Sequence, residues 1–160
     1  MLRTDALSVA SLLAPERVQV GLPAQSKEAV IEAVIEQLGG APAVRDLGRV
    51  RDAVFAREAV MSTGVGKGLA LPHARTDAVS DTVAAFAVTA GPVDYGALDG
   101  QPVRLVFLLV GPEGERSTHV RLLSRISRLM NRDAFRARLL QARDAEAVLA
   151  AFREGEEEIG

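Results

Sequence analysis

The chain has 160 residues and a formal net charge of −2, with 48% hydrophobic and 25% charged residues. These values are typical of one globular domain with a buried core. Cys and Trp are absent and there is one Tyr. Disulfides, thiolate metal sites and a cysteine nucleophile are therefore excluded in this chain, and a nucleic-acid partner is not expected. We find no apolar run of membrane-spanning length and no signal-peptide pattern, so we expect a cytoplasmic protein with no direct membrane insertion.

The first half of the chain predicts a strand, two helices and a loop. Residues 17–20 alternate polar and apolar side chains, as a half-buried strand does. Residues 26–38 and 46–58 carry apolar stripes at helical spacing, and Ser26 can cap the first of these helices. Residues 62–68 contain too many glycines for a regular element and predict a loop.

The second half predicts further strands and then helices. A short strand over 69–71 should stop at Pro72, and residues 83–89 and 105–110 are continuous apolar runs, typical of strands covered on both faces. The last third is helical, with expected helices that begin at Ser117 or Thr118, span 133–140 and span 144–152.

Strands interleaved with helices predict an α/β protein, a three-layer α/β/α sandwich with a mixed, mostly buried sheet flanked by helices. No linker or change of composition divides the chain, so we expect a single domain over residues 1–153. Residues 154–160 are acidic and polar, and predict a frayed C-terminal tail.

Two histidines are the candidates for nucleophilic chemistry. His73 follows a predicted strand, and ligands bind at the carboxyl ends of strands in open α/β sheets. A neutral imidazole leaves one ring nitrogen free to attack. His119 lies in the first turn of a helix, in line with Leu122 and Ile126, so we expect it to face the interior beside unsatisfied helix N–H groups. Taken alone, each histidine is more typical of a structural role.

The glycine-rich loop and the arginines are weaker candidates. Gly64, Gly66 and Gly68 alternate, but neither the dinucleotide pattern nor the P-loop pattern is complete. The loop either lets a backbone or phosphate approach closely or is a plain connection. Arg57 precedes it and has a donor fork suited to a phosphoryl group, although a solvated Arg is the simpler interpretation. No H-x-x-H or H-E-x-x-H spacing occurs, so we expect no metal and no cofactor.

Together these residues resemble the enzyme IIA domain of the fructose/mannitol type from the bacterial sugar phosphotransferase system, together with its nitrogen-regulatory paralogues. The active-site signature of that family reads here as Glu58, six residues, Val65-Gly66, two residues, and Leu69-Ala70-Leu71-Pro72-His73-Ala74. The likeness extends to the segment 98–103 and to His119 before Leu122, Leu123 and Ser124, and spans residues 7–152.

The resemblance implies a phosphotransferase whose His73 accepts a phosphoryl group on Nε2 from the phosphocarrier protein HPr. The acceptor is then a cysteine of an enzyme IIB partner, in fructose-like sugar uptake. His119 and Arg57 match the other active-site residues of the family, and Ser62, Thr63, Gly64 and Gly66 match a loop that contacts the phosphoryl group or a partner.

Two alternatives remain open. In the first, the phosphorylation state of His73 controls binding to target proteins and no sugar is delivered, as in the nitrogen-regulatory paralogues. In the second, the chain is an unrelated metal-dependent hydrolase. A basic stripe is either a docking surface for an acidic patch or a solvated helix face; if it docks, Arg125→Glu should weaken transfer from HPr. The stripe consists of Arg121, Arg125, Arg128 and Arg132.

Overall fold

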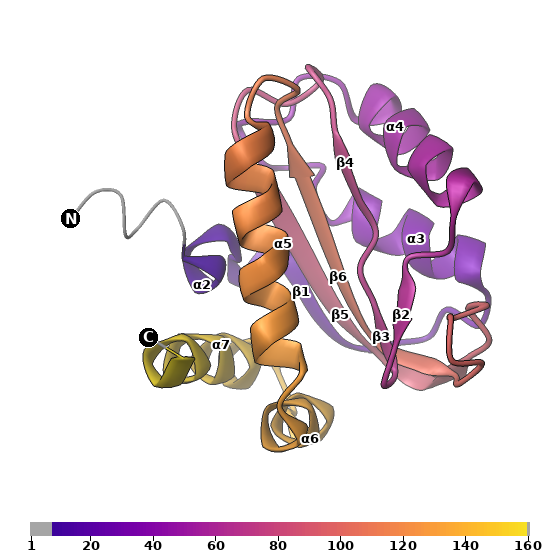
Figure 1. Ribbon diagram of the computed structural model, residues 1–160, viewed down its shortest axis with the longest axis vertical. Coiled ribbons are helices and arrows are strands. Elements are labelled where there is room, and N and C mark those ends of the chain that lie inside the picture. The colour runs from indigo at the N-terminus through magenta and orange to yellow at the C-terminus, as the bar shows by residue number, and fades with distance from the viewer. Residues whose placement is uncertain (1–7, 160) are drawn as a thin grey trace.

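The computed structural model describes residues 8–159, which form three layers (Figure 1). The strands are β1 (Val18–Leu22), β2 (Gly64–Gly66), β3 (Leu69–Ala70), β4 (His73–Arg75), β5 (Val83–Val93) and β6 (Val103–Gly111). The helices are α2 (Val9–Leu12), α3 (Lys27–Glu36), α4 (Leu47–Val60), α5 (Arg116–Met130), α6 (Asp133–Gln141) and α7 (Ala145–Ile159), with a 3-10 turn at Pro15–Arg17.

The central layer is a mixed sheet in the order β1-β5-β6-β3-β2, with β4 also paired to β6. β5 and β6 form an antiparallel pair at its centre, while β1 runs parallel to β5, and β3 and β4 run parallel to β6. The prediction of a three-layer sandwich with a mixed, buried sheet is confirmed. No helix within residues 8–159 is long and apolar enough to cross a bilayer.

Both faces of β5 and β6 are buried, as their continuous apolar runs predict. Along β5, Ala85 packs with the residues of α3 and α4, while its neighbour Phe86 packs on the opposite face with α5 and α7. The rings of Phe86, Phe107 and Phe152 meet at centroid distances of 5.3 to 6.1 Å. Each face of the sheet therefore has its own core.

The predicted helices α3 and α4 are confirmed, including their first residues. Ser26 Oγ accepts a hydrogen bond from the backbone N–H of Ala29, and Asp46 Oδ1 caps α4 in the same way. The predicted start of α5 at Ser117 or Thr118 is wrong. A turn closed by the N–H of Glu115 on the carbonyl of Pro112 starts the helix earlier, with no side-chain cap.

The prediction of a loop over residues 62–68 is wrong for its centre. Residues 64–66 form β2, which pairs antiparallel with β3. The turn between them consists of Lys67 and Gly68, with φ values of 58° and 79°, and two successive positive φ angles are the requirement of a tight hairpin turn. The glycines therefore permit a hairpin here.

The predicted short strand is β3, which ends before Pro72 as expected, but the pairing with β6 resumes at once in β4. β3 and β4 pair with β6 in one continuous register, Leu69 opposite Leu105 and His73 opposite Leu109. Pro72 has no N–H to donate, but its carbonyl accepts the N–H of Leu109 at 3.1 Å. His73 is thus the first residue of β4, which resumes the pairing with β6 after Pro72.

The predicted frayed tail is wrong for residues 154–159, which continue α7. Glu156 is only 7% exposed. Its carboxylate accepts hydrogen bonds from the backbone N–H groups of Val9 (2.7 Å) and Ala10 (2.9 Å), and pairs with Arg125 Nε at 2.7 Å. The end of α7 is therefore held by α2 and α5, because one acidic residue of this segment has partners far away in the chain.

Candidate functional site

A pocket of about 350 Å³ lies at the sheet edge where α4 and α5 flank β4. β4 is bonded only to β6 within the described residues, so helices from both faces of the sheet reach it. The structure brings together here the three side chains that the sequence predicts, Arg57 from α4, His73 from β4 and His119 from α5. The other lining residues are Ala53, Ala74, Arg75, Arg116, Val120 and Leu123.

His73 is half-buried, and one of its ring nitrogens is fixed by the backbone. Nδ1 lies 2.8 Å from the carbonyl oxygen of Leu71. A carbonyl can only accept, so Nδ1 carries the proton and Nε2 keeps its lone pair. Burial lowers the pKa of His73, and the charge of Arg57 lowers it further, against the Leu71 bond and Glu58, which raise it. The ring is therefore a neutral nucleophile near pH 7.

His119 is 5% exposed and faces His73, with the two ring centroids 5.7 Å apart. Neither of its ring nitrogens has a hydrogen-bond partner within the described residues. Burial, then the charges of His73 and Arg75, lower the pKa of His119 to about 4. A buried polar group without a partner is costly, and this ring has one N–H to offer to an oxyanion that enters the pocket.

Two further arginines, Arg75 and Arg116, line the pocket, although neither was predicted from the sequence as a site residue. The signal was available in the spacing: Arg75 lies two residues after His73 on the same strand face, and Arg116 lies one helical turn before His119. No lining residue is acidic, so the pocket favours an anion. Within residues 8–159, no three His, Asp or Glu side chains are grouped as metal ligands.

The loop residues that the sequence predicts for the site do not line this pocket. Thr63 is 2% exposed. Gly64 is buried, and a Cβ there would lie 2.8 Å from Ala97 Cα and 2.9 Å from Tyr95 Cδ1, so close packing accounts for this glycine. Gly66 lines a separate hollow of about 440 Å³ between the β2–β3 hairpin and α5.

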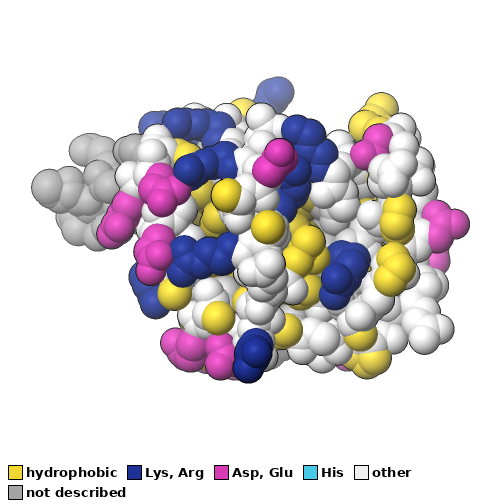
Figure 2. Space-filling model, turned by 90° about the horizontal axis from the view of Figure 1, so that it is seen from below, with side chains coloured by type: hydrophobic (Ala, Val, Ile, Leu, Met, Phe, Trp, Pro, Cys, Tyr) yellow, Lys and Arg dark blue, Asp and Glu magenta, His cyan; other side chains and the backbone are white. Residues whose placement is uncertain are grey.

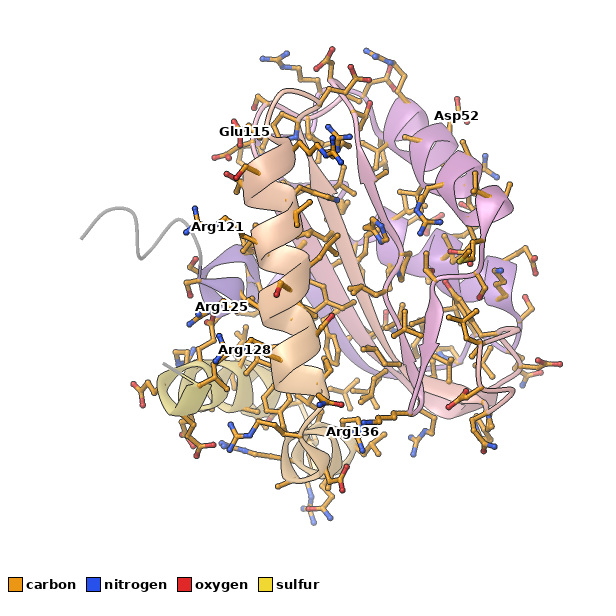
Figure 3. All side chains as sticks on the ribbon, viewed as in Figure 1. Asp52, Glu115, Arg121, Arg125, Arg128 and Arg136 are labelled. Atoms are coloured by element: carbon orange, nitrogen blue, oxygen red, sulfur yellow. The ribbon has the colours of Figure 1, made fainter. Side chains whose placement is uncertain are left out.

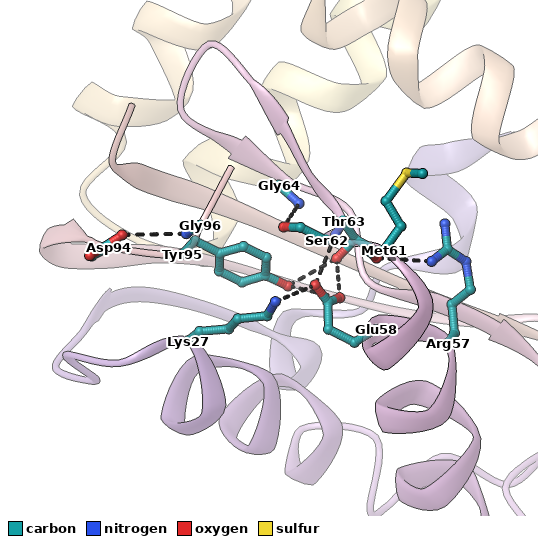
Figure 4. A network of polar contacts seen from close by, with 10 residues as sticks. All are labelled: Lys27, Arg57, Glu58, Met61, Ser62, Thr63, Gly64, Asp94, Tyr95 and Gly96. Carbon is teal, nitrogen blue, oxygen red and sulfur yellow. Dashed lines mark hydrogen bonds and ion pairs between the residues drawn. The ribbon is translucent and has the colours of Figure 1, made fainter. Parts of the chain in front are cut away.

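A buried polar cluster lies beside the pocket, at the end of α4 (Figure 4). Glu58 Oε2 pairs with Lys27 Nζ at 2.8 Å and accepts the N–H of Thr63 at 2.8 Å. Thr63 Oγ1 donates to Glu58 Oε1 and lies 3.0 Å from the hydroxyl of Tyr95. Burial opposes ionisation of Glu58, but Lys27 and Thr63 outweigh it and keep the pKa of that carboxyl below its ordinary value.

The basic stripe of α5 lies on the side that faces α2 and α7, as the labelled Arg121, Arg125 and Arg128 show (Figure 3). Arg125 binds Glu156, Arg128 donates to the carbonyl of Ile159, and Arg132 pairs with Glu158 at 2.7 Å. Seen from the end that holds α6 and α7, basic side chains lie next to acidic ones (Figure 2). Most of the stripe therefore attaches α7.

Comparison with known proteins identifies the family. The family described as "Phosphoenolpyruvate-dependent sugar phosphotransferase system, EIIA 2" matches residues 11–155. The fructose-specific EIIABC component of Bacillus subtilis is 36% identical over 143 residues, which are 89% of this chain and 22% of that protein. The chain thus spans about a fifth of that relative.

Two further similarities concern nitrogen regulatory proteins. That of Pseudomonas aeruginosa is 36% identical over 137 residues, covering 86% of this chain and 89% of the relative. The crystal structure of nitrogen regulatory protein IIA-Ntr from Neisseria meningitidis superposes with a TM-score of 0.84 at 30% identity, over 90% of this chain and 98% of that one. Because the family pattern matches residues 11–155, most of its length, the chain belongs to the EIIA 2 family of the phosphoenolpyruvate-dependent sugar phosphotransferase system.

Proposed function

We propose that this chain is a phosphohistidine carrier in which His73 Nε2 accepts a phosphoryl group from an HPr-type protein. Family membership gives a role in phosphoryl transfer in general. The observation that carries the finer proposal is the pocket in which the free Nε2 of His73 lies beside the unpartnered ring of His119, with arginines and no carboxylate around them.

The reaction is a pair of displacements at phosphorus. The lone pair on His73 Nε2 forms the new N–P bond as the bond to the donor breaks. Nδ1 keeps its proton on the carbonyl of Leu71 throughout. A thiolate of an enzyme IIB partner then forms an S–P bond as the N–P bond breaks, and the electron pair returns to Nε2. No proton has to move on this chain in either step.

Such a transfer is catalysed by aligning the nucleophile with the phosphorus and by stabilising the negative charge on the phosphoryl oxygens. Arg57 donates to the carbonyl of Met61 at 3.0 Å and lines the pocket, so its guanidinium is placed to take a phosphoryl oxygen. The N–H of neutral His119 is a second donor. Neither Arg75 nor Arg116 is paired with a carboxylate among the described residues, and both add positive potential.

A docked partner would keep water from the phosphohistidine by covering the apolar rim. Val120 lines the pocket and is 53% exposed, and Met61, beside Arg57, is 57% exposed. Val65 is also exposed, whereas Leu69 and Leu71 are buried and contribute nothing to a contact surface. We assign partner contact to Val120, Met61 and Val65.

A second candidate function is regulatory, with the phosphorylation state of His73 controlling target proteins. The observation in its favour is the likeness over nearly full length to nitrogen regulatory proteins, against similar identity to a fructose-specific relative. Incubating the phosphorylated chain with a fructose-type enzyme IIB decides between them. Loss of the phosphoryl group to IIB supports transport, and retention supports regulation.

The carrier role itself is tested by phosphorylation with phosphoenolpyruvate, enzyme I and HPr, read by intact mass and acid lability. We expect one acid-labile phosphoryl group on the wild type, none on His73→Ala, and slower transfer to His119→Ala. A wild type that stays unmodified with active donors would refute the proposal.

A further inference from the structure

The buried cluster around Glu58 places a carboxylate where burial is unfavourable for the free energy of folding, and the phosphoryl-transfer steps do not explain why it is there. Glu58 is 7% exposed and lies in the last turn of α4, where the helix dipole disfavours a negative charge. Burying a carboxylate costs several kcal/mol unless it is paired and hydrogen-bonded. Lys27, Thr63 and Tyr95 supply those partners, and the Lys27 ammonium also lies 5.1 Å from the centre of the Tyr95 ring.

A continuous set of hydrogen bonds leads from this cluster to the nucleophile. Thr63 donates its N–H and hydroxyl to Glu58, and its carbonyl oxygen accepts the N–H of Leu71 at 2.8 Å. The carbonyl of Leu71 in turn accepts Nδ1–H of His73 at 2.8 Å. The residue that holds His73 in its reactive tautomer is therefore itself held by Thr63.

The same segment is also bonded to Arg57, which lines the pocket. Arg57 precedes Glu58 on α4 and donates to the carbonyl of Met61, two residues before Thr63. The turn after α4 is thus attached at Met61 and at Thr63 to adjacent residues of one helix end (Figure 4). A shift of Thr63 would displace the carbonyl that orients His73 and the carbonyl that orients Arg57 together.

We infer that Thr63 and Tyr95 are positioning residues for phosphoryl transfer, holding Glu58 and the Leu71 carbonyl so that His73 presents Nε2 to the phosphorus. The inference rests on the proposed function for its kinetic consequence only. Tyr95 lies at the end of the hydrogen-bonded set that is farthest from His73. Its hydroxyl is 3.0 Å from Thr63 Oγ1 and 3.4 Å from Glu58 Oε1, and so holds both side chains. Neither side chain lines the pocket, so neither is a catalytic residue.

The test compares Thr63→Val and Tyr95→Phe with a matched control, Thr89→Val. Thr89 is fully buried and its hydroxyl donates to the carbonyl of Gly91 at 2.7 Å, in a part of the sheet that does not contact the pocket. All three substitutions remove one buried hydroxyl and preserve the shape of the side chain. Thr63→Ser, which keeps the hydroxyl, is the rescue variant.

For Thr63→Val and Tyr95→Phe we expect phosphorylation at saturating HPr to slow about tenfold, with the KM for HPr within about twofold of wild type, as for a loss of orientation at the reacting centre. Thr63→Ser should transfer at close to the wild-type rate. Thr89→Val should lose stability in urea denaturation without losing rate.

The ¹⁵N chemical shifts of His73 give a readout independent of transfer. Wild type and Thr89→Val should show a protonated Nδ1 and a bare Nε2, and Thr63→Val a mixture of tautomers. Wild-type rates and wild-type ¹⁵N shifts in Thr63→Val would overturn the inference, as would an equal loss of rate in Thr89→Val. If the wild type accepts no phosphoryl group, the proposed function fails, and the tautomer measurement alone still decides the positioning role.

Discussion

The buried, neutral His119 makes folding stability depend on pH in a window where few other groups titrate. Its pKa is lowered to about 4 in the folded protein, against an ordinary 6.5, first by burial and then by the charges of His73 and Arg75. The unfolded chain therefore binds a proton at this ring more readily than the folded one. Folding stability must then rise with pH between these two values, and fall as the pH drops below 6.5.

The magnitude follows from the two pKa values. Each unit of pKa difference corresponds to about 1.4 kcal/mol, so the free energy of unfolding falls by about 3 kcal/mol once His119 is protonated in both states. At pH 5 about 2 kcal/mol of the free energy of unfolding is already lost relative to pH 7. The pKa of His73 is also lowered, and it adds a loss of the same sign. The pKa values of Glu58 and Glu156 lie below the ordinary 4.5. Their contributions to folding stability are therefore lost as the pH falls below that value, at the acid end of the window of His119.

The assay is urea denaturation at pH 7 and pH 5 for the wild type and for His119→Gln, which keeps a polar side chain and removes the titration. We expect the free energy of unfolding of the wild type to fall by at least about 2 kcal/mol over this range, and that of the variant by about 2 kcal/mol less. Equal pH dependence in the two proteins would refute the assignment of a neutral, buried His119. Direct NMR titration of its ring should show a midpoint near pH 4.

Three further predictions concern the packing around the site and α7. Glu156→Gln should lower the free energy of unfolding at pH 7 by about 2 to 4 kcal/mol in thermal denaturation, because Arg125 loses its buried counter-charge. Arg125→Glu should destabilise at least as much, since it places a second carboxylate against Glu156, so slower transfer from HPr in that variant would report unfolding rather than docking. Gly64→Ala should destabilise the fold by about 1 to 3 kcal/mol and slow phosphorylation, because the added Cβ meets Ala97 and Tyr95 below 3 Å.

Each of these predictions has a matched control in the chain. Glu157→Gln changes an exposed neighbour of Glu156 and should stay within about 0.5 kcal/mol of wild type. Arg121→Glu reverses the charge of an exposed stripe residue that has no ion pair within residues 8–159, so it isolates any docking effect. Gly40→Ala adds a Cβ with no heavy atom within 4 Å. A control that loses as much stability as its partner variant contradicts the corresponding explanation.

Local patterns predicted the elements that depend on near neighbours in the chain. Ser26 and Asp46 begin helices because their side chains accept N–H groups three residues ahead. The apolar runs of β5 and β6 predicted strands covered on both faces because a buried strand needs no polar side. The motif around His73, with Arg57 and His119, predicted which side chains gather at the pocket, since the family resemblance already encodes their proximity.

The errors that affect the tail and the site lie where a contact joins distant parts of the chain. Residues 154–159 look like a solvated acidic tail, yet Glu156 binds the N–H of Val9, 147 positions away. The glycines of 62–68 suggest either a loop that lets a backbone or phosphate approach or a plain connection, yet Gly64 is small because Tyr95 and Ala97 pack against it. The sequence placed Thr63 in a loop that contacts the phosphoryl group or a partner, yet Thr63 is buried and links Glu58 to His73 through its hydrogen bond with Leu71.

The sequence by itself determined the class of fold and the helix starts at Ser26 and Asp46, because periodicity and capping are short-range properties. The two histidines and the arginine at the pocket were indicated by the resemblance to the family and not by local pattern. Only the tertiary structure decided the tautomer of His73, the low pKa of His119 and the burial of Glu58. These depend on desolvation and on partners brought together by folding, and neither quantity is defined until the chain has folded.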